Sequence, residues 1–387
     1  MKERRYTFHY ALIQSSYWMT FCVAISFATI YLQGIGLSNT QLGILSALSN
    51  LSGMFIGPWL AGKMDSDERW SAMRLAPYLL GIQALSCLIL LVKGEERVIG
   101  AVVFAVFMAF CSSFNTLVLK IYADLNHQGA HLNYSLARGI GSLSFVVISA
   151  LTGVLVEKTS IRIIPLISLL LIAYQAISFF RIRNDLTETA FERKGEENAS
   201  MLRFIRENPR LTIMLFGTAI LFFSHNVITN FLINIVRNVG GDAGMSGLLN
   251  SFMALMELPV MFLYDRLFGK KDQGRMLKIA FIAFTVKELS FALSKNTASL
   301  LASFLFQAPS FAIYSSAIVP YVDSRVKFSD SAKAQSLSYT MTNLGAVLAS
   351  VIAGTLYDTI SVTSTLWVGL AVSAIGTVIC LLGMKDR

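Results

Sequence analysis

Long apolar stretches dominate this chain, and short polar segments separate them. Each stretch holds about 20 mostly apolar residues, the length that an α-helix needs to cross the hydrocarbon core of a bilayer. The pattern therefore predicts an all-α integral membrane protein with twelve transmembrane helices. The expected spans are 8–32, 40–62, 72–92, 98–122, 133–156, 161–180, 209–236, 244–266, 275–294, 297–321, 334–356 and 361–383.

The second half of the chain repeats the first at an offset of about 201 residues. The matching residues are Ser135, Leu136, Leu143, Gly153 and Leu155 with Ser336, Leu337, Leu344, Gly354 and Leu356. Such a duplication predicts two pseudo-symmetric six-helix bundles, 1–180 and 207–387, that expose one central site alternately to either side. Between them, residues 181–206 carry eleven charged side chains and form the expected cytoplasmic linker.

Composition agrees with a membrane protein. Hydrophobic residues make up 55% of the chain, charged residues only 14%, and the mean hydropathy is +0.61. This leaves too little charge for the exterior of a soluble protein of this length. All four cysteines lie within apolar stretches, which gives no indication of disulfides or of a metal cluster.

The basic residues are distributed unevenly among the loops. With the N-terminus in the cytoplasm, the inner segments hold 24 lysines and arginines and the outer segments hold six. This bias obeys the positive-inside rule and predicts that both termini are cytoplasmic. The net charge of +9 then reflects topology and contact with anionic membrane lipids, and gives no reason to expect a nucleic-acid partner.

Four charged residues fall within the expected spans: Arg138, Glu257, Lys287 and Glu288. Burial of a charge in a membrane is costly, so each suggests a function. Glu257 and Lys287 lie about 14 and 16 residues from the turn between their helices, hence at similar depth. We expect them to pair, either as a switch for protons and substrate or as a static ion pair. Glu288 points about 100° away from Lys287 and is less expected to face a cavity.

Arg138 precedes Gly139, Gly141 and Ser142, small residues that allow another helix to approach closely. Its guanidinium could bind a substrate carboxylate or a pair of hydroxyls with two parallel hydrogen bonds. Alternatively it could pair with an acid near the inner end of the preceding span, where Lys120 and Asp124 lie.

Uncharged polar residues recur on single helical faces and complete the candidate site. They are Asn226, Asn230 and Asn234, then Gln307, Ser310 and Tyr314, then Tyr10, Gln14 and Trp18. Amides, hydroxyls and an aromatic plate suit a neutral polyhydroxylated or heterocyclic solute. The alternative for each is hydrogen bonding between helices. His225 is interpreted as a core residue, and the sequence offers no metal ligand set, catalytic nucleophile or P-loop.

Several local patterns resemble a known family. Tyr264-Asp265-Arg266 with Gly269-Lys270-Lys271 and Arg275 is similar to the loop signature of the major facilitator superfamily, and Asp65 after Gly57 and Gly62 is similar to a reduced first copy. We assign Asp65, Asp265 and Arg266 to this gating motif. Other patterns resemble the branch of this superfamily that includes lactose permease, nucleoside permeases and phenylpropionate permease. They are Tyr134 with Arg138, Gly141-Ser142 and Phe145, Ser224-His225, Gln335-Ser336-Leu337 and Gly354-Thr355-Leu356-Tyr357-Asp358.

The resemblance implies symport of a small organic solute (sugar, nucleoside or aromatic acid) with protons, by a monomer in the bacterial inner membrane, without a cofactor. It also implies that Arg138 binds substrate. Lys287 then stands where the branch has an arginine in its ninth transmembrane helix. Gln307 and Ser310 stand where lactose permease has a histidine and a proton-carrying glutamate, and Lys120 replaces its helix 4 glutamate. Glu257 is therefore the expected proton carrier, unless the chain is a uniporter.

Two other function classes are considered. An exporter of drugs or metabolites would use the same fold. A broadly aromatic, less polar cavity would favour export, and the asparagines at 226, 230 and 234 argue mildly against such a cavity. A membrane receptor without transport activity would need a large soluble output segment, which this sequence lacks. An intramembrane enzyme would need a catalytic set, so no enzymatic activity is expected.

For a transporter, the expected substrate contacts are Arg138, Asn226, Asn230, Gln14, Trp18, Gln307 and Tyr314, with Glu257 and Lys287 in proton coupling.

Overall fold

A computed structural model describes residues 2–66, 70–127, 134–183, 201–268, 272–327 and 330–384. Helices account for all regular elements in these ranges. Those before residue 184 are α1 (Lys2–Phe21), the π-helix η1 (Cys22–Ser26), α2 (Ala28–Gly34), α3 (Asn39–Ser66), α4 (Ala72–Lys93), α5 (Arg97–His127), α6 (Tyr134–Lys158) and α7 (Ile163–Arg183).

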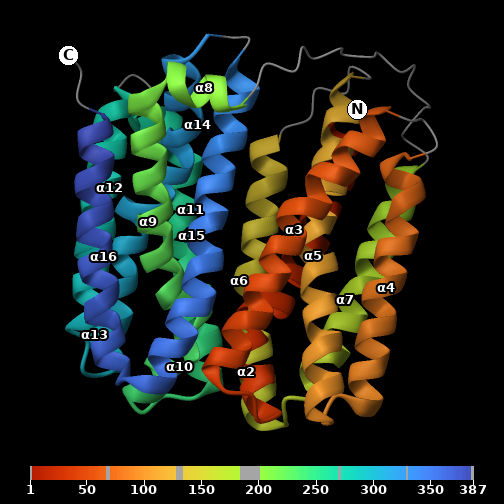
Figure 1. Ribbon diagram of the computed structural model, residues 1–387. Helices are drawn as coiled ribbons and strands as arrows, with labels where there is room; N and C mark the ends of the chain where they lie inside the picture. Colours follow the sequence, from red (N-terminus) through yellow and green to blue (C-terminus); the bar gives the residue numbers. More distant parts are fainter. Residues whose placement is uncertain are drawn as a thin grey trace. The chain divides into compact units, whose positions relative to one another are not determined.

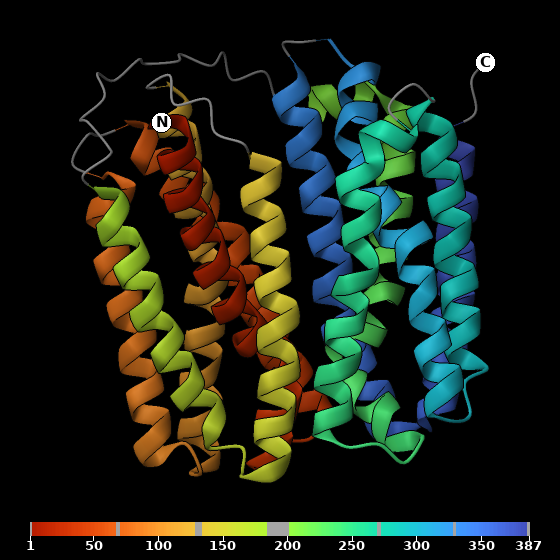
Figure 2. The ribbon, with the colours of Figure 1, turned by 180° about the vertical axis from the view of Figure 1, so that it is seen from behind.

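The helices after residue 200 follow the same plan (Figures 1 and 2). They are α8 (Met201–Glu207), α9 (Pro209–Asn230), α10 (Leu232–Asn238), α11 (Ala243–Phe268), α12 (Gln273–Ala292), α13 (Thr297–Ser303), the 3₁₀-helix η2 (Phe304–Gln307), the π-helix η3 (Ala308–Ala312), α14 (Ile313–Arg325), α15 (Ser331–Thr359) and α16 (Val362–Gly383). The predicted linker 181–206 includes the end of α7 and most of α8, and its residues 184–200 lie outside the described ranges.

Within the described residues, every predicted span lies mainly on helix. Within the described ranges, nine helices are long and apolar enough to cross a membrane, and α1 with η1, bent by 42° against α2, makes a possible tenth. The predicted spans 40–62 and 275–294 correspond to α3 and α12, which are not in this set. Four charged residues lower the apolar content of α12. Two of them, Lys287 and Glu288, are buried within the protein.

The chain forms two compact units. Unit 1 comprises Met1–Gly195 and Asp242–Ala254, and unit 2 comprises Glu196–Gly241 and Leu255–Arg387. The sequence placed residues 242–254 in the second bundle, whereas these residues group with unit 1. There Ser149 Oγ donates to the Gly247 carbonyl at 3.0 Å and Ser251 Oγ donates to the Val146 carbonyl at 2.8 Å.

The same helix pairs pack together inside each unit. In unit 1, α1 packs against α6 and α7, and α4 packs against α5 and α7. In unit 2, α9 packs against α15 and α16, and α12 packs against α14 and α16 (Figure 1). These pairs correspond one to one under the sequence repeat. The N-caps repeat as well, because Ser71 and Asp272 begin α4 and α12 at an offset of 201 and each side chain accepts from a backbone N–H.

The first long helix of each half is interrupted at a buried phenylalanine. Phe27 separates η1 from α2, and Phe231 separates α9 from α10, 204 residues later. Both side chains are fully buried, and both backbones leave helical geometry, with ψ of 3° and 25°. Each short helix after the break ends before a glycine with positive φ, Gly36 at 86° and Gly240 at 83°. Only glycine adopts this conformation without steric cost, so the duplication extends to local backbone geometry.

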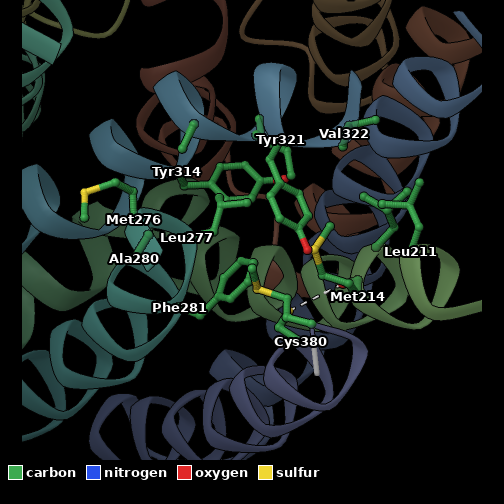
Figure 3. Packing of buried hydrophobic residues seen from close by; sticks show 14 of the residues in the cluster. Leu211, Met214, Met276, Leu277, Ala280, Phe281, Tyr314, Tyr321, Val322 and Cys380 are labelled. Atoms are coloured by element: carbon green, nitrogen blue, oxygen red, sulfur yellow. Dashed lines mark hydrogen bonds between the residues drawn. The ribbon is translucent and has the colours of Figure 1, made fainter. Parts of the chain in front are cut away.

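Close helix packing in unit 2 depends on glycines. A Cβ on Gly217 of α9 would lie 2.6 Å from Cys380 Sγ, and one on Gly383 of α16 would lie 2.5 Å from the Met214 nitrogen. Helices in a membrane gain little from the hydrophobic effect, so small residues that permit close van der Waals contact stabilise such pairs. Around this contact lies a core cluster from α9, α12, α14 and α16, which includes Tyr314 (Figure 3).

Candidate functional site

Unit 2 holds a buried cluster of polar side chains, which we call the Lys287 cluster: His225, Glu257, Lys287 and Gln307. Lys287 Nζ lies 2.8 Å from His225 Nδ1 and donates to Gln307 Oε1 at 3.3 Å. Gln307 Nε2 in turn donates to Glu257 Oε1 at 2.9 Å. The amide of Gln307 therefore joins the cation and the carboxylate, with its two ends matched to their charges.

Four elements build this cluster. His225 comes from α9, Glu257 from α11, Lys287 from α12 and Gln307 from η2. Lys287 and Gln307 are each 2% exposed and His225 is 8% exposed, whereas Glu257 is half-buried. A buried ammonium without partners would be very costly, so the acceptors around it are a condition of its burial.

The irregular backbone around Gln307 has a local cause. The helix is 3₁₀ over Phe304–Gln307 and π over Ala308–Ala312, where Pro309 lacks the N–H that a regular helix requires. The Ser310 hydroxyl donates to the Phe306 carbonyl at 2.6 Å and satisfies part of the interrupted ladder. Such irregular turns often occur at functional positions of helices.

Aromatic rings surround the polar cluster. Lys287 Nζ lies 4.8 Å from the centre of the Phe284 ring. The His225 ring stacks on Phe311 at 5.3 Å, and Phe222 lies 5.8 Å from His225. An ammonium over a ring face is attracted by about 0.5–2 kcal/mol, more when desolvated. The cluster thus combines a cation, a carboxylate and several rings in one place.

Unit 1 holds a second polar cluster, which we call the Trp18 cluster: Tyr10, Gln14, Trp18, Arg138 and Ser142. The Arg138 guanidinium carbon lies 3.9 Å from the centre of the Trp18 ring. Trp18 Nε1 donates to Gln14 Oε1 at 2.9 Å, and Gln14 Nε2 donates to Tyr10 Oη at 2.7 Å. Arg138 also donates to the hydroxyl of Ser142. The three predicted substrate contacts of this half therefore lie together.

A glycine explains how α1 and α6 come so close at this cluster. A Cβ on Gly141 would lie 2.7 Å from Trp18 Cδ1 and 3.2 Å from the Gln14 carbonyl oxygen. The sequence predicted that the small residues after Arg138 would permit such an approach. In α5, Asp124 forms an ion pair with Lys120 of the same helix at 3.3 Å.

The structure connects the predicted pair Glu257 and Lys287 through Gln307, which the sequence assigned to substrate contact. It also adds His225, which sequence reasoning interpreted as an ordinary core residue. The sequence signal for His225 was its place at the edge of the asparagine face. The rotation of α9 toward α12 decides the contact, and spacing within one helix carries no information about that rotation.

The remaining predicted contacts have packing partners inside unit 2. Asn226 Nδ2 donates to the Phe222 carbonyl within α9 at 2.7 Å, and Asn230 Nδ2 donates to Ser350 Oγ of α15 at 3.2 Å. Asn234 lies beyond the break at Phe231, in α10, so the expected ladder is not one continuous helix face. Substrate contact by Asn226 and Asn230 stays a prediction.

Tyr314 is 4% exposed and belongs to the hydrophobic core cluster of unit 2 (Figure 3). Its ring lies 5.1 Å from that of Phe222 and 6.1 Å from that of Phe284, both of which border the Lys287 cluster. Tyr314 therefore supports the rings around Lys287, and its predicted contact with substrate is untested.

The loop motif is only partly described. Arg266 is an exposed residue in the last turn of α11. Asp65 and Asp265 lie in α3 and α11, but their side chains are outside what the structure describes, as are residues 269–271 with Lys270 and Lys271. Beside the motif, Tyr264 Oη donates to Gln273 Oε1 at 2.5 Å and links α11 to α12. Within the described part of the chain, no group of three or more histidines, cysteines and carboxylates could hold a metal ion.

Residues 10–368 match the MFS_1 like family. The chain belongs to this family. It is 27% identical over 283 residues, 72% of each chain, to a probable 3-phenylpropionic acid transporter of Escherichia coli (strain K12). Its fold is similar to that of the nucleoside transporter NupG (D323A mutant), with a TM-score of 0.80, 14% identity and coverage of 97% of this chain and 100% of that one.

A POT family peptide transporter has the same fold, with a TM-score of 0.77, 11% identity and coverage of 99% of this chain and 97% of the other. Family and fold together establish a multi-pass integral membrane transporter of the major facilitator superfamily. The protein moves a small-molecule solute and is not an enzyme.

Proposed function

We propose that this transporter carries a small aromatic acid across the membrane together with protons. The observation that carries the proposal is a cation on an aromatic face in each unit: Arg138 on Trp18 and Lys287 on Phe284, at 3.9 and 4.8 Å. A cation can bind a carboxylate while the neighbouring rings contact an aromatic ring. The probable 3-phenylpropionic acid transporter supports the same class of substrate.

Sugars and nucleosides are the other substrates that the sequence suggests. Hydroxyl-rich solutes need many amide and hydroxyl partners. In this structure, the amides of Asn226, Asn230 and Gln307 already bond within unit 2. An aromatic acid needs fewer such partners, which favours it among the three classes.

Proton coupling follows from the charges of the Lys287 cluster. Glu257 is half-buried and is joined through Gln307 to a buried ammonium, so a change in its protonation would alter the charge balance of the cluster. Arrival of a substrate carboxylate near Lys287 would compete with Glu257 for the same cation. In this proposal the protein works as a monomer in a bacterial inner membrane, with both termini in the cytoplasm.

The test is uptake into proteoliposomes of the purified full chain with an imposed pH gradient. Labelled 3-phenylpropionate, uridine and lactose are offered separately, with and without a protonophore. We expect accumulation of 3-phenylpropionate above equilibrium that the protonophore abolishes, beyond the accumulation in protein-free liposomes. Accumulation of uridine or lactose alone would change the substrate class, and proton-driven extrusion of all three would indicate an exporter.

Glu257→Gln tests the role of Glu257 in proton coupling with a nearly isosteric side chain. We expect accumulation against a gradient to be lost while exchange of labelled for unlabelled substrate is still measurable. Glu207→Gln is the matched control, because Glu207 pairs with Arg203 on the exposed face of α8. Full accumulation in Glu257→Gln would overturn the role of Glu257.

A further inference from the structure

Glu288 has a buried carboxyl group that the mechanism above does not use. The side chain is 1% exposed, and neither carboxyl oxygen has a hydrogen-bond partner among the described residues. A charged carboxylate in such a place would be very costly, because nothing replaces its lost water. A neutral carboxylic acid costs far less. Geometry alone therefore indicates that Glu288 holds a proton in this state.

Three helices of unit 2 enclose this carboxyl. It projects from α12 toward Gly369 of α16, where a Cβ would lie 3.6 Å from Glu288 Oε2 and 3.9 Å from Val227 Cγ1 of α9. The absence of a side chain at Gly369 leaves room for the carboxyl group. On α15, Tyr357 is close enough to interact electrostatically with Glu288. The titratable and charged groups nearby are thus the Tyr357 phenol and the Lys287 ammonium.

A single turn of α9 connects this carboxyl with the Lys287 cluster. His225 contacts Lys287 at 2.8 Å. One residue earlier, Ser224 Oγ donates to the Gly369 carbonyl at 2.9 Å. Two residues later, the Val227 carbonyl accepts from Tyr357 Oη at 3.3 Å. A shift of this turn that alters the His225 contact would therefore also alter the walls around Glu288.

The charges of neighbours Lys287 and Glu288 are complementary. Their side chains leave α12 about 100° apart. Lys287 has His225 and Gln307 as hydrogen-bond partners, whereas the carboxyl group of Glu288 has no hydrogen-bond partner among the described residues. If Glu288 loses its proton, the nearest opposite charge is already in place on the same helix.

We propose that Glu288 is a proton-binding site of the transport cycle, which takes up and releases the coupled proton. This inference rests on the proposed proton coupling and adds a carboxyl group to it. On release, the O–H bond of the acid breaks, its electron pair stays on the carboxylate, and the proton passes to water on one side of the membrane. Uptake from the other side reverses these changes. Glu257 then sets the charge near Lys287, and Glu288 stores the proton.

Infrared spectroscopy tests the protonation directly and requires no substrate. The full chain in lipid nanodiscs is measured at neutral pH in light and heavy water, and the C=O stretch of a protonated carboxylic acid is recorded. We expect this band in the wild type and in Glu257→Gln, and its loss in Glu288→Gln. An unchanged band in Glu288→Gln, or no such band in the wild type, would overturn the proposal.

Transport then tests whether this proton is the coupled one. With one proton per substrate, a gradient of one pH unit supports about tenfold accumulation of a solute whose net charge on entry is zero. We expect this ratio to fall to that of protein-free liposomes in Glu288→Gln, while Glu207→Gln keeps the wild-type ratio. Exchange of labelled substrate checks that Glu288→Gln is folded and binds its solute.

The two proposals fail in different ways. If the wild type shows no proton-driven accumulation of any offered solute, the proposed proton coupling is wrong, whatever the infrared spectra show. If the wild type accumulates solute and Glu288→Gln does so equally, coupling stands and Glu288 is a static acid of the fold. Glu288→Asp supplies a second variant, since it keeps the acid and shortens its reach. We expect it to retain part of the accumulation that Glu288→Gln loses.

Discussion

Arg138 lies with its guanidinium carbon 3.9 Å from the centre of the Trp18 ring. The indole is fixed in turn by its hydrogen bond to Gln14 at 2.9 Å. A guanidinium over a ring face can also form paired hydrogen bonds with a carboxylate through its edge. This arrangement orients the cation before substrate arrives, so less conformational entropy is lost on binding.

Arg138→Lys keeps the charge but loses the planar fork and most of the stacking on Trp18. We expect KM for 3-phenylpropionate uptake to rise about tenfold, which corresponds to about 1.4 kcal/mol of lost binding. Initial uptake rates over a range of concentrations measure it. Arg203→Lys on α8 is the control and should leave KM unchanged. An unchanged KM in Arg138→Lys would argue against contact between Arg138 and the substrate.

Gln307→Leu tests the amide that joins Lys287 and Glu257. The leucine has similar size but cannot accept from the ammonium or donate to the carboxylate. We expect a loss of about 1–3 kcal/mol in the free energy of unfolding, because buried polar groups lose a partner. Thermal unfolding in detergent measures the change. In Gln335→Leu, where the lost bonds to Asp323 and the Val319 carbonyl are near the surface, the loss should be smaller. Equal stability of Gln307→Leu and wild type would contradict the bridge.

The sequence predicted the helices well because the bilayer imposes a length and an apolar composition on each span. It did not predict the breaks at Phe27 and Phe231, since neither residue is a glycine or proline that interrupts a helix by its own chemistry. These breaks depend on tertiary packing around two buried rings. Tertiary packing also groups residues 242–254 with unit 1, which no local pattern indicates.

For the candidate site, the sequence indicated how deep the residues lie along their helices, but not how each helix is turned about its axis. Counting residues from a turn placed Glu257 and Lys287 at similar depth, and the structure joins them through Gln307. Which side chain fills the space between two helices depends on how each helix is turned about its axis. For this reason His225 was not recognised as a partner of Lys287. The prediction that Glu288 points away from Lys287 agrees with the position of its carboxyl group beside Gly369.

Gly345→Ala tests the close packing of α9 and α15. An added Cβ would overlap the Ala219 carbonyl oxygen and lie 2.9 Å from the Phe223 nitrogen, both on the α9 backbone. Because a backbone cannot move aside as a side chain can, we expect a loss of about 1–3 kcal/mol in stability. Gly81→Ala on α4 is the matched control, since a Cβ there meets nothing within 4 Å.

The control should be neutral or stabilising by up to about 1 kcal/mol, because alanine restricts the unfolded chain more than glycine does. Thermal unfolding of both variants under identical detergent conditions gives the comparison. Similar midpoints for the two variants would show that α9 and α15 can separate at little cost.

The exposed pair Glu95 and Arg162 gives a prediction about pH. These residues join the loop before α5 to the loop before α7 within unit 1, and Arg162 Nε donates to Glu95 Oε1 at 2.5 Å. The hydrogen bond and the charge of Arg162 lower the pKa of Glu95 below its usual value of 4.5. The folded state therefore binds this proton less tightly than the unfolded chain does. The pair should stabilise the fold above about pH 4.5, and this contribution should disappear as pH falls through the lowered pKa.

Arg162→Ala removes the pair, so its melting temperature should lie below that of the wild type at neutral pH. The two values should converge under more acidic conditions, where Glu95 is protonated in both. Added salt should reduce the neutral-pH difference, since both side chains are exposed and the charges are screened. Arg162→Lys keeps the charge without the paired hydrogen bonds, so its melting temperature at neutral pH should lie between those of Arg162→Ala and the wild type. A difference that stays constant from neutral to acidic pH would mean that Arg162 stabilises the loops by packing and not through the Glu95 carboxylate.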